Sequence, residues 1–600
     1  MKTKLFLAAM AAVAVIGCQK EPNAPSVADG QASFMKVELK SAGAITKATT
    51  GTYEDAIAGE NTVSSVTFYF FDQNGGEYVV QGKENYMTGT AGDLSSVNDD
   101  LNNIDVQSGI MLVIKQHADP DDLPAKMVAV LNAPASLLEK GSMSLQELEK
   151  EMSVLQNSDN TFVMSNSVYL DNDNNKINYT AITKNNLFKV NLEEGQPGYN
   201  APGTIINADS YKGEITDING TATTFENVTV EVYVERVAAK VRVAGLTSEG
   251  VGNVLPVAIS EKDKTQLEIK RMVVGTDGKI VEETTEQKVW AKVLGWDVTN
   301  TVNEAYLLKN FGTDDAWKST ANNKAFGFEP WNVPTLYRSY WAMSTSKDPV
   351  HNLKFNDLKG KHVGENTKNY DYYYENTAAA EKDNSVDVGF AAGNPAGNKA
   401  SQLLVAVQLC SGADAASAKP MDVARWYGKY YTIDALKSAM IATVDHRIFK
   451  KVDGVVTPIT FGDVVFVQVP ETDAEKRYNV VPTAKTDFSY FDVSGASLST
   501  EKVNEILKTI DPAQMWGNEN GYGLAYYYTT ISHFGDAKGI VRNHIYDINI
   551  TTIAGLGTPV YNPGGTITPE EPEDNEALNL SARINILTWH VVQNDVTLGN

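Results

Sequence analysis

The stretch that best indicates the fold closes the chain: residues 578–600 read LNLSARINILTWHVVQNDVTLGN. Its first half places apolar side chains at every second position, the period of a half-buried β-strand, at Leu578, Leu580, Ala582, Ile584 and Ile586. At Leu587 the phase shifts by one residue, as at a β-bulge, and Trp589 continues the apolar face. The pattern predicts a terminal strand. It leaves open whether that strand completes the sheet of its own domain or of a neighbouring subunit.

A linker precedes this strand. Residues 561–577 contain the sequence PGGTITPEEPEDNEA at 563–577. A run so rich in proline, glycine and acidic residues cannot bury a core and is typical of an extended linker. A linker of about 15 residues reaches up to roughly 50 Å, because extended chain spans about 3.3–3.6 Å per residue. The terminal strand is therefore expected to sit on a tether long enough to reach another subunit.

The composition is that of a folded, acidic protein. The chain has 600 residues, 42% of them hydrophobic, and a formal net charge of -24. This length and hydrophobic content suffice for several cores or a few large ones. The negative charge argues against nucleic acid as a partner, because its phosphates would be repelled.

The N-terminus is predicted to be a secretion signal. Two lysines precede an apolar run over 5–16 that is too short to span a bilayer. The run ends in VIGC at 15–18, which resembles the signal box of a bacterial lipoprotein. Residues 1–18 are therefore expected to be a lipoprotein signal peptide, with acyl chains such as palmitate on Cys18 holding the precursor to the outer membrane. Ordinary signal cleavage nearby is the alternative.

A short strand and an exposed loop follow the signal segment. Apolar residues alternate with charged ones over 35–40, which predicts the first strand. The strand runs into a loop of small and polar residues in which Lys47 is followed by Ala48. Such a loop is a candidate site for proteolytic cleavage. Residues 19–47 are interpreted as a propeptide that contains the first strand.

Further strands indicate two domains. Valines alternate from Val228 to Val243 with a phase shift after Arg236, which predicts one long bent strand. This strand is expected to end a first domain of residues 48–247, and residues 248–560 form the second. Helices are predicted to be few and short, at 145–152, 433–443 and 500–510. The excess of strands over helices favours a mainly β protein of β-sandwiches with short helical decorations.

The sequence lacks catalytic and metal-binding patterns. The seven histidines are scattered and form neither HExxH nor a paired metal spacing. The run DNDNN at 171–175 departs from a calcium loop at the sixth and twelfth positions, which are Lys176 and Ile182. Cys410, the only cysteine besides that of the signal, is expected to be packed and unreactive. The sequence therefore predicts no catalytic residue, no metal and no cofactor.

Three tyrosine clusters support an alternative, in which the chain is a surface lipoprotein adhesin that binds glycan or host protein. They lie at 372–374, 430–431 and 526–528. Tyrosine also has high strand propensity and often lines the edges of sandwiches, so the clusters alone do not decide between the two functions.

Several short stretches add a resemblance. The late part of the chain contains AYYYTTISHF at 525–534, VRNHIY at 541–546, IAGLGTP at 553–559 and ILTW at 586–589. Earlier stretches are KMVAVLN at 126–132, FVMS at 162–165, ERVAAKV at 235–241 and YRSYWA at 337–342. In this order, and behind a lipoprotein signal, they resemble the fimbrillins of Bacteroidia, the subunits of protease-matured type V pili, and most of all the minor-fimbrillin-like branch.

The resemblance implies a fold and a mode of assembly. It implies two transthyretin-like β-sandwich domains in a lipoprotein precursor that reaches the cell surface. A maturing protease then removes the propeptide with the first strand. The open groove accepts the C-terminal donor strand, residues 578–600 here, of another copy or of a related pilus subunit. In physical terms this is β-augmentation, with ladder hydrogen bonds and alternating side chains in pockets.

One feature departs from the family pattern. The family is usually cut after arginine, but the first arginine of this chain is Arg236. Lys47-Ala48 is the best substitute, and it requires a protease that accepts lysine. The chain is therefore interpreted as a structural subunit of a cell-surface pilus, without enzyme activity. If it is not cut, it would instead be an anchor or tip accessory subunit.

Overall fold

The computed structural model describes residues 33–41, 53–54, 59–60, 62–76, 107–114, 124–141, 143–167, 169–170, 176–177, 179–196, 205–207, 211–244, 253–259, 266–310, 328–330, 337–339, 344–345, 350, 352–363, 368–377, 400–469, 479–518, 520–533, 539–567 and 589–599. The signal peptide with Cys18, the predicted cleavage site at Lys47-Ala48 and the donor-strand residues from Leu578 to Ile586 lie outside these ranges. Within them strands greatly outnumber helices, so the mainly β prediction is confirmed.

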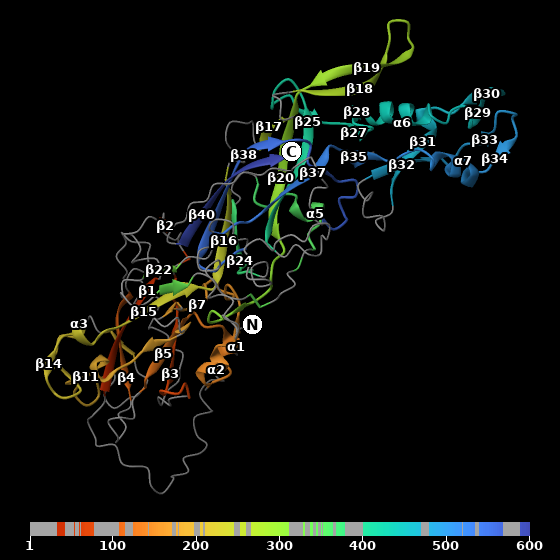
Figure 1. Cartoon of the computed structure of the whole chain (residues 1–600). Coiled ribbons are helices and arrows are strands. Elements are labelled where there is room, and N and C mark those ends of the chain that lie inside the picture. The colour runs from red at the N-terminus through yellow and green to blue at the C-terminus, as the bar shows by residue number, and fades with distance from the viewer. Residues whose placement is uncertain are drawn as a thin grey trace, which may run out of the picture.

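The first sheet is built from the N-terminal part of the chain and lies at the lower left of Figure 1. Its strands are β1 (Ser33–Ser41), β3 (Val66–Phe71), β4 (Gln107–Ile114), β5 (Lys126–Leu131), β7 (Met164–Asn166), β10 (Thr180–Ala181), β11 (Leu187–Val190), β12 (Ile205–Asn207), β13 (Ile215–Asp217), β14 (Ala222–Thr223) and β15 (Val230–Arg236). They are ordered β10-β5-β7-β15-β1-β11-β13-β14, with β3 beside β5, β4 beside β1 and β12 beside β4. The alternating valines of β15 face the core, since Val230, Val232 and Val234 are at most 3% exposed.

The second sheet occupies the middle of the molecule (Figure 1). Its strands are β2 (Tyr53–Glu54), β16 (Ala238–Ala244), β17 (Val254–Ala258), β20 (Val289–Thr299), β24 (Tyr370–Tyr374), β25 (Gln402–Ser411), β26 (Lys419–Pro420), β37 (Leu524–Thr530), β38 (His544–Ala554), β39 (Thr558–Pro559) and β40 (Trp589–Gly599). The order is β2-β40-β38-β17-β20-β25-β37-β39, with β16 beside β38 and β24, and β26 beside β25.

The chain passes from the first sheet to the second at Val237. β15 pairs with β1 and β7, whereas β16 pairs with β24 and β38. The alternating valines therefore form two strands in different sheets, where the sequence pattern predicts one bent strand. The division falls at the phase shift after Arg236. There the side chain of Val237 points into a separate apolar cluster, together with Val163 and Leu307.

A bulge in the second sheet requires a glycine. The register of β20 with β25 shifts between Val293 and Gly295. At Gly295 φ is 158°, and a Cβ would lie 1.7 Å from the carbonyl oxygen of Leu358. Only a residue without a side chain permits this close backbone approach.

A third layer comes largely from residues 412–523, which are inserted between neighbouring strands. β25 and β37 pair directly, with Gln408 opposite Leu524, so a short hairpin would have sufficed to join them. The inserted residues instead have a hydrophobic cluster of their own, which includes Leu436, Val503 and Met515. The sequence places this region inside the predicted second domain, 248–560, without distinguishing it as a layer of its own.

The third layer contains two sheets and two helices. Its larger sheet has the order β19-β18-β28-β27-β35-β32-β31, with β36 beside β35, and the smaller one β30-β29-β33-β34. The elements are β18 (Leu267–Val274), β19 (Ile280–Gln287), β27 (Val423–Trp426), β28 (Lys429–Tyr431), α6 (Ile433–Ile441), β29 (Phe449–Val452), β30 (Val455–Pro458), η6 (Phe461–Asp463), β31 (Val464–Gln468), β32 (Asn479–Ala484), β33 (Tyr490–Phe491), β34 (Ser497–Leu498), α7 (Thr500–Leu507), β35 (Ala513–Asn518) and β36 (Gly521–Tyr522).

The helices in the described residues are short, and a helix lies at each of the three predicted places, although the one predicted at 145–152 ends at Leu148. This helix, α2 (Leu145–Leu148), begins after Ser144, whose side chain forms a capping box with Glu147. α7 begins after Ser499, which accepts a hydrogen bond from the backbone of Lys502. The remaining elements are α1 (Ala135–Leu138), α2 (Leu145–Leu148), β6 (Met152–Ser153), β8 (Tyr169–Leu170), β9 (Lys176–Ile177), η2 (Lys184–Asn186), α3 (Phe225–Val228), β21 (Ala305–Tyr306), β22 (Phe328–Pro330), β23 (Tyr337–Ser339) and α5 (Phe355–Leu358).

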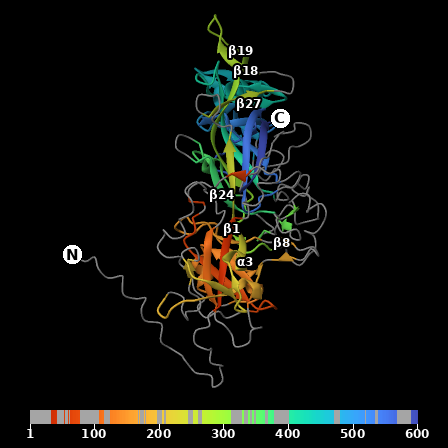
Figure 2. The same ribbon diagram turned by 90° about the vertical axis from the view of Figure 1, so that its left-hand side faces the viewer.

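The three layers follow one another along the length of the molecule. Figures 1 and 2 place the first sheet at one end, the second sheet in the middle and the inserted layer at the other end. The hairpin of β18 and β19 projects from this far end in both views. The first and second sheets therefore meet at a junction, and the inserted layer lies far from it.

Candidate assembly site

The strand of the predicted propeptide occupies an interior position in the first sheet. On one side β1 runs antiparallel to β4, from Ser33 opposite Ile114 to Leu39 opposite Gln107. On the other side it pairs with β11 and then runs parallel to β15 up to Ser41. The Met35 side chain is fully buried in the core. Removing β1 would leave a groove flanked by the unpaired backbone edges of β4 on one side and of β11 and β15 on the other.

The predicted cleavage site lies between elements of different sheets. Lys47 and Ala48 are outside the described residues, but the strands before and after them are described. β1 ends at Ser41 in the first sheet, and β2 begins at Tyr53 in the second. A cut between Lys47 and Ala48 would therefore separate β1 from the rest of the chain without breaking a described strand.

The terminal strand lies on the second sheet of its own chain. β40 runs parallel to β38, with His590 opposite His544 and Gly599 opposite Ala554. Its other edge pairs antiparallel with β2, with Tyr53 opposite His590. Of the predicted donor residues only Trp589 is described, and it lies in β40. Leu578, Leu580, Ala582, Ile584 and Ile586 lie outside the described residues. In the single chain, residues 589–599 thus follow the own-sheet alternative that the sequence left open.

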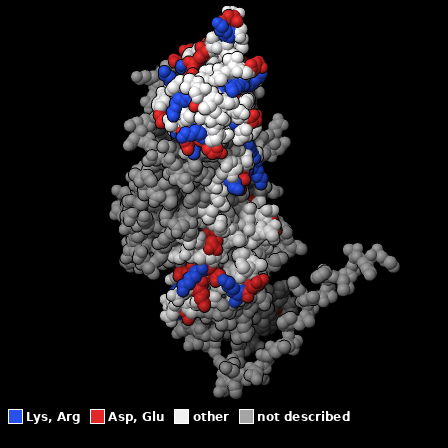
Figure 3. All heavy atoms as spheres, turned by 90° about the vertical axis from the view of Figure 1, so that its right-hand side faces the viewer, with Lys and Arg blue, Asp and Glu red and all other residues white. Residues whose placement is uncertain are grey.

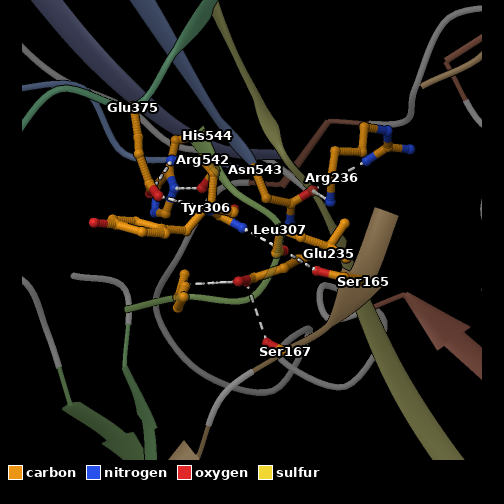
Figure 4. A network of polar contacts seen from close by, with 11 residues as sticks. Ser165, Ser167, Glu235, Arg236, Tyr306, Leu307, Glu375, Arg542, Asn543 and His544 are labelled. Atoms are coloured by element: carbon orange, nitrogen blue, oxygen red, sulfur yellow. Dashed lines mark hydrogen bonds and ion pairs between the residues drawn. The ribbon is translucent and has the colours of Figure 1, made fainter. Parts of the chain in front are cut away.

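A buried polar network joins the first sheet to the second (Figure 4). Arg542 lies just before β38, is fully buried and donates from Nε to Oε1 of Glu375 at 3.0 Å. Its terminal nitrogens donate to the carbonyl oxygens of Tyr306 and Leu307, at 2.6 and 3.1 Å. The hydroxyl of Ser165, on β7 of the first sheet, donates to the same Leu307 carbonyl at 2.6 Å.

A second buried ion pair reinforces this junction. The side chains of Lys309 and Glu235 are both 0% exposed, and Nζ lies 3.0 Å from the carboxylate. The Ser167 hydroxyl donates to the same carboxylate at 3.2 Å. The next residue on β15, Arg236, donates from Nη1 to Oδ1 of Asn543 at 3.2 Å. Because a buried charge that loses its partner is strongly destabilising, these contacts hold the two sheets in one arrangement.

Glu60 fastens the segment after the predicted cut to the same junction. Its carboxylate accepts hydrogen bonds from Nζ of Lys240 at 2.8 Å and from the hydroxyl of Tyr372 at 2.6 Å. Its backbone carbonyl accepts one from Nε of Arg236 at 2.9 Å. Burial by itself would raise the pKa of Glu60, but the charge and hydrogen bond of Lys240 hold that pKa below its ordinary value. Glu60 is therefore a buried, ionised anchor.

This network was missed at the level of sequence, although one signal was present. The strands that carry Glu235, Arg236 and Lys240 are otherwise rich in valine, and all three charged residues are at most 4% exposed. Charged residues seldom occur at inward positions unless they are paired. Their partners could not be found from spacing, because Glu60 and Lys309 lie far away in the chain.

Two of the late histidines, His533 and His544, are packed inside the protein. His533 is fully buried, and its Nδ1 lies 2.8 Å from the hydroxyl of Tyr546. That hydroxyl accepts a hydrogen bond from the backbone of Val541 at 2.7 Å. Burial, with Lys309 nearby, lowers the pKa of His533 to about 3, so the ring is neutral at physiological pH.

The tyrosines that suggested a glycan surface are buried or half-buried. Tyr526 and Tyr527 are 2% exposed. The hydroxyls of Tyr372 and Tyr373 donate to Glu60 and Asp297, at 2.6 and 2.7 Å. The described tyrosine with the most exposed side chain is one that no cluster contains: Tyr427, at 68%. The clusters at 372–374 and 526–528 thus contribute mainly to packing.

Other candidate chemistry is absent from the described part of the chain. No group of three or more His, Cys, Asp or Glu residues there could hold a metal ion. No helix among the described residues is both long and apolar enough to cross a membrane. On the face drawn in Figure 3, the basic and acidic residues of the far-end layer are interspersed and surround an uncharged area. The described residues therefore offer no metal cluster, and those of the far-end layer show no single-sign patch in this view.

The protein is mainly β. A strand near its N-terminus, β1, lies in the first sheet, and a strand near its C-terminus, β40, lies in the second. Residues 520–595 match the family model of the C-terminal part of fimbrillin, the major fimbrial subunit protein type IV. This C-terminal part of the chain is therefore similar to that of the fimbrillins. The match covers β37, β38 and the first part of β40, the elements that bear the strongest sequence resemblance.

Solved structures of fimbrial proteins match this chain at low identity and with low TM-scores. Mfa3, the tip fimbrial protein of Porphyromonas gingivalis solved with a C-terminal truncation, is 12% identical, with 66% of this chain and 83% of that one covered and a TM-score of 0.23. A fimbrial assembly protein of Parabacteroides distasonis is 11% identical, with 66% and 86% covered and a TM-score of 0.20. No curated protein matches the chain. The similarity to fimbrillins therefore rests on the C-terminal match.

Proposed function

We propose that this chain is a structural subunit of a cell-surface pilus that polymerises by exchange of a β-strand. The match of residues 520–595 to the C-terminal part of fimbrillin supports a structural role in a pilus, in contact with other pilus subunits. The observation that carries the mechanism is the position of β1, which lies inside the first sheet and is joined to the rest of the chain only through the segment with the predicted cut.

The proposed pathway begins with a lipoprotein precursor. Residues 1–18 direct export, and acylated Cys18 holds the precursor to the outer membrane. A protease that accepts lysine cuts between Lys47 and Ala48 and removes the propeptide, 19–47. The mature chain then comprises the domains 48–247 and 248–560. No step of this pathway requires catalysis by the chain itself.

The terminal segment 578–600, carried on the linker 561–577, then enters the groove of the next subunit. A strand that enters this groove meets backbone edges on both sides, so it gains ladder hydrogen bonds along both. In the uncut chain β1 fills this groove and buries Met35 in the core. The alternating apolar residues of 578–586 could bury side chains in the same way. The donated strand would replace the contacts that the propeptide strand gives up.

Two variants test the donation. Replacing Ile584 by Asp would place an unpaired charge in the groove, at a cost on the order of several kcal/mol, and should abolish polymers. The matched control Asn585→Asp lies on the alternate face and should polymerise normally. Size-exclusion chromatography and electron microscopy of cut chains give the readout. Polymers formed equally well by both variants would refute the donation of this segment.

The maturation step has its own test. N-terminal sequencing of subunits from purified fibres should find Ala48 as the first residue. Fibres whose subunits retain acylated Cys18 would contradict the cut and favour the anchor or accessory alternative.

A further inference from the structure

We infer that the short strand β2 holds the terminal strand β40 on its own sheet in the precursor, so that the cut which frees the groove also loosens the donor strand. This inference rests on the proposed function, because it concerns the same two chain ends. We call the pairing of Tyr53–Glu54 with β40 the β2 clasp.

The clasp pairs with two residues on the edge of β40 that faces away from β38. β38 pairs with β40 along its length, from His544 to Ala554. On the opposite edge, Tyr53 pairs with His590 and Glu54 with Trp589, at the end of β40 where the linker enters. This end is where a strand pulled by its linker would begin to detach. The clasp therefore lies at the point where release would start.

Two anchors position the clasp in the uncut chain. On its C-terminal side, Glu60 is 2% exposed and is bound by Lys240, Tyr372 and Arg236 at 2.6–2.9 Å. On its N-terminal side, the chain leads back to Ser41, which is paired with Val234 in the first sheet. Because both ends of this segment are fixed, β2 is kept close to β40 and its effective concentration there is high.

A cut between Lys47 and Ala48 removes one of the two anchors. The Glu60 anchor remains, but β2 then lies near a free N-terminus, where short strands open readily. A two-residue strand contributes few ladder hydrogen bonds, so its retention depends on this tethering. The same cleavage thus creates the acceptor groove and weakens the hold on the donor. The uncut precursor is kept from donating its strand early.

Hydrogen exchange on the full-length precursor tests the clasp directly. Tyr53→Pro removes a backbone donor from β2 and should speed exchange of the 589–599 amides about tenfold in the uncut chain. Cutting the wild-type chain should have the same effect. The matched control Gln73→Pro lies in the Asp72–Gly76 turn, at a position that suits proline, and should leave these amides unchanged. Equal exchange in all four forms would overturn the inference.

A reversible crosslink gives a second test that does not depend on a weakened fold. Tyr53 and His590 are paired residues, so the double variant Tyr53→Cys, His590→Cys should form a disulfide across the clasp. Once cut, the oxidised chain should not polymerise until it is reduced. A disulfide between Val274→Cys and Ile280→Cys, paired at the exposed end of the β18–β19 hairpin, is the control and should not affect polymerisation.

A failure of the clasp and a failure of the proposed function give different results. If the oxidised Tyr53–His590 variant polymerises as fast as the hairpin control, β40 need not leave β2 and the inference is wrong. If cut wild-type chains never polymerise, the proposed function is wrong, and the exchange rates still show whether β2 holds β40.

Discussion

Removing the charge of Arg542 should destabilise the protein far more than removing any surface charge. The side chains of Arg542 and Glu375 are 0% and 1% exposed. In Arg542→Met the Glu375 carboxylate stays buried without its cation, which costs about 3–5 kcal/mol. The carbonyls of Tyr306 and Leu307 also lose a charged donor, so we expect the upper end of this range.

Urea unfolding followed by tryptophan fluorescence measures this change, with the double variant Arg542→Met, Glu375→Met as the decisive comparison. The double variant leaves no unpaired charge, so it should be more stable than Arg542→Met alone, by about 2 kcal/mol. The control Lys502→Met breaks an ion pair whose partners are 61% and 64% exposed, and should leave the midpoint unchanged. Additive losses in the double variant would refute the reasoning, since they would mean that the two side chains do not interact.

Two further predictions concern stability. The pKa of His533 is about 3 in the folded chain against 6.5 ordinarily, so its contribution to stability is complete above pH 6.5 and is lost as the pH falls below that value. Between pH 7 and 5 the free energy of unfolding should fall by about 2 kcal/mol. Urea titrations at the two pH values measure this loss, which should vanish in His533→Gln. Gly295→Ala should abolish or strongly destabilise the fold, because its Cβ would strike the Leu358 carbonyl oxygen at 1.7 Å. Gly278→Ala, in an open turn at φ 76°, should cost only about 1–2 kcal/mol of stability. If Gly295→Ala and Gly278→Ala had equal melting temperatures, the close approach at Gly295 would not matter for stability.

Local features of the fold could be predicted from the sequence. The alternation of Val230, Val232 and Val234 identifies a strand with one buried face, and these residues are buried. Ser144 identifies the start of a short helix, because a cap acts on residues three positions away. These predictions succeed since the interactions that decide them are between close neighbours in the chain.

Features that depend on distant contacts could not be predicted. The phase shift after Arg236 marks a break in the strand pattern, but it does not show that the strands on either side join different sheets, because strand pairing is chosen by partners elsewhere. The pairing of Glu60 with Lys240 is of the same kind. The neighbours of β1 in the sheet also come from far along the chain, and they are what make its removal consequential. The resemblance to fimbrillins implies that the first strand is removable. The pairing of β1 shows which strand edges its removal would leave open.

The insertion of residues 412–523 has a consequence for the order in which the protein can fold. β25 and β37 are adjacent in the second sheet, yet the second of them emerges from the ribosome only after the whole inserted layer. That layer has its own hydrophobic cluster, and many of its contacts are local, so it can collapse first. The middle sheet must wait with an open edge until β37 is available, and this edge is exposed to wrong pairing while the chain folds.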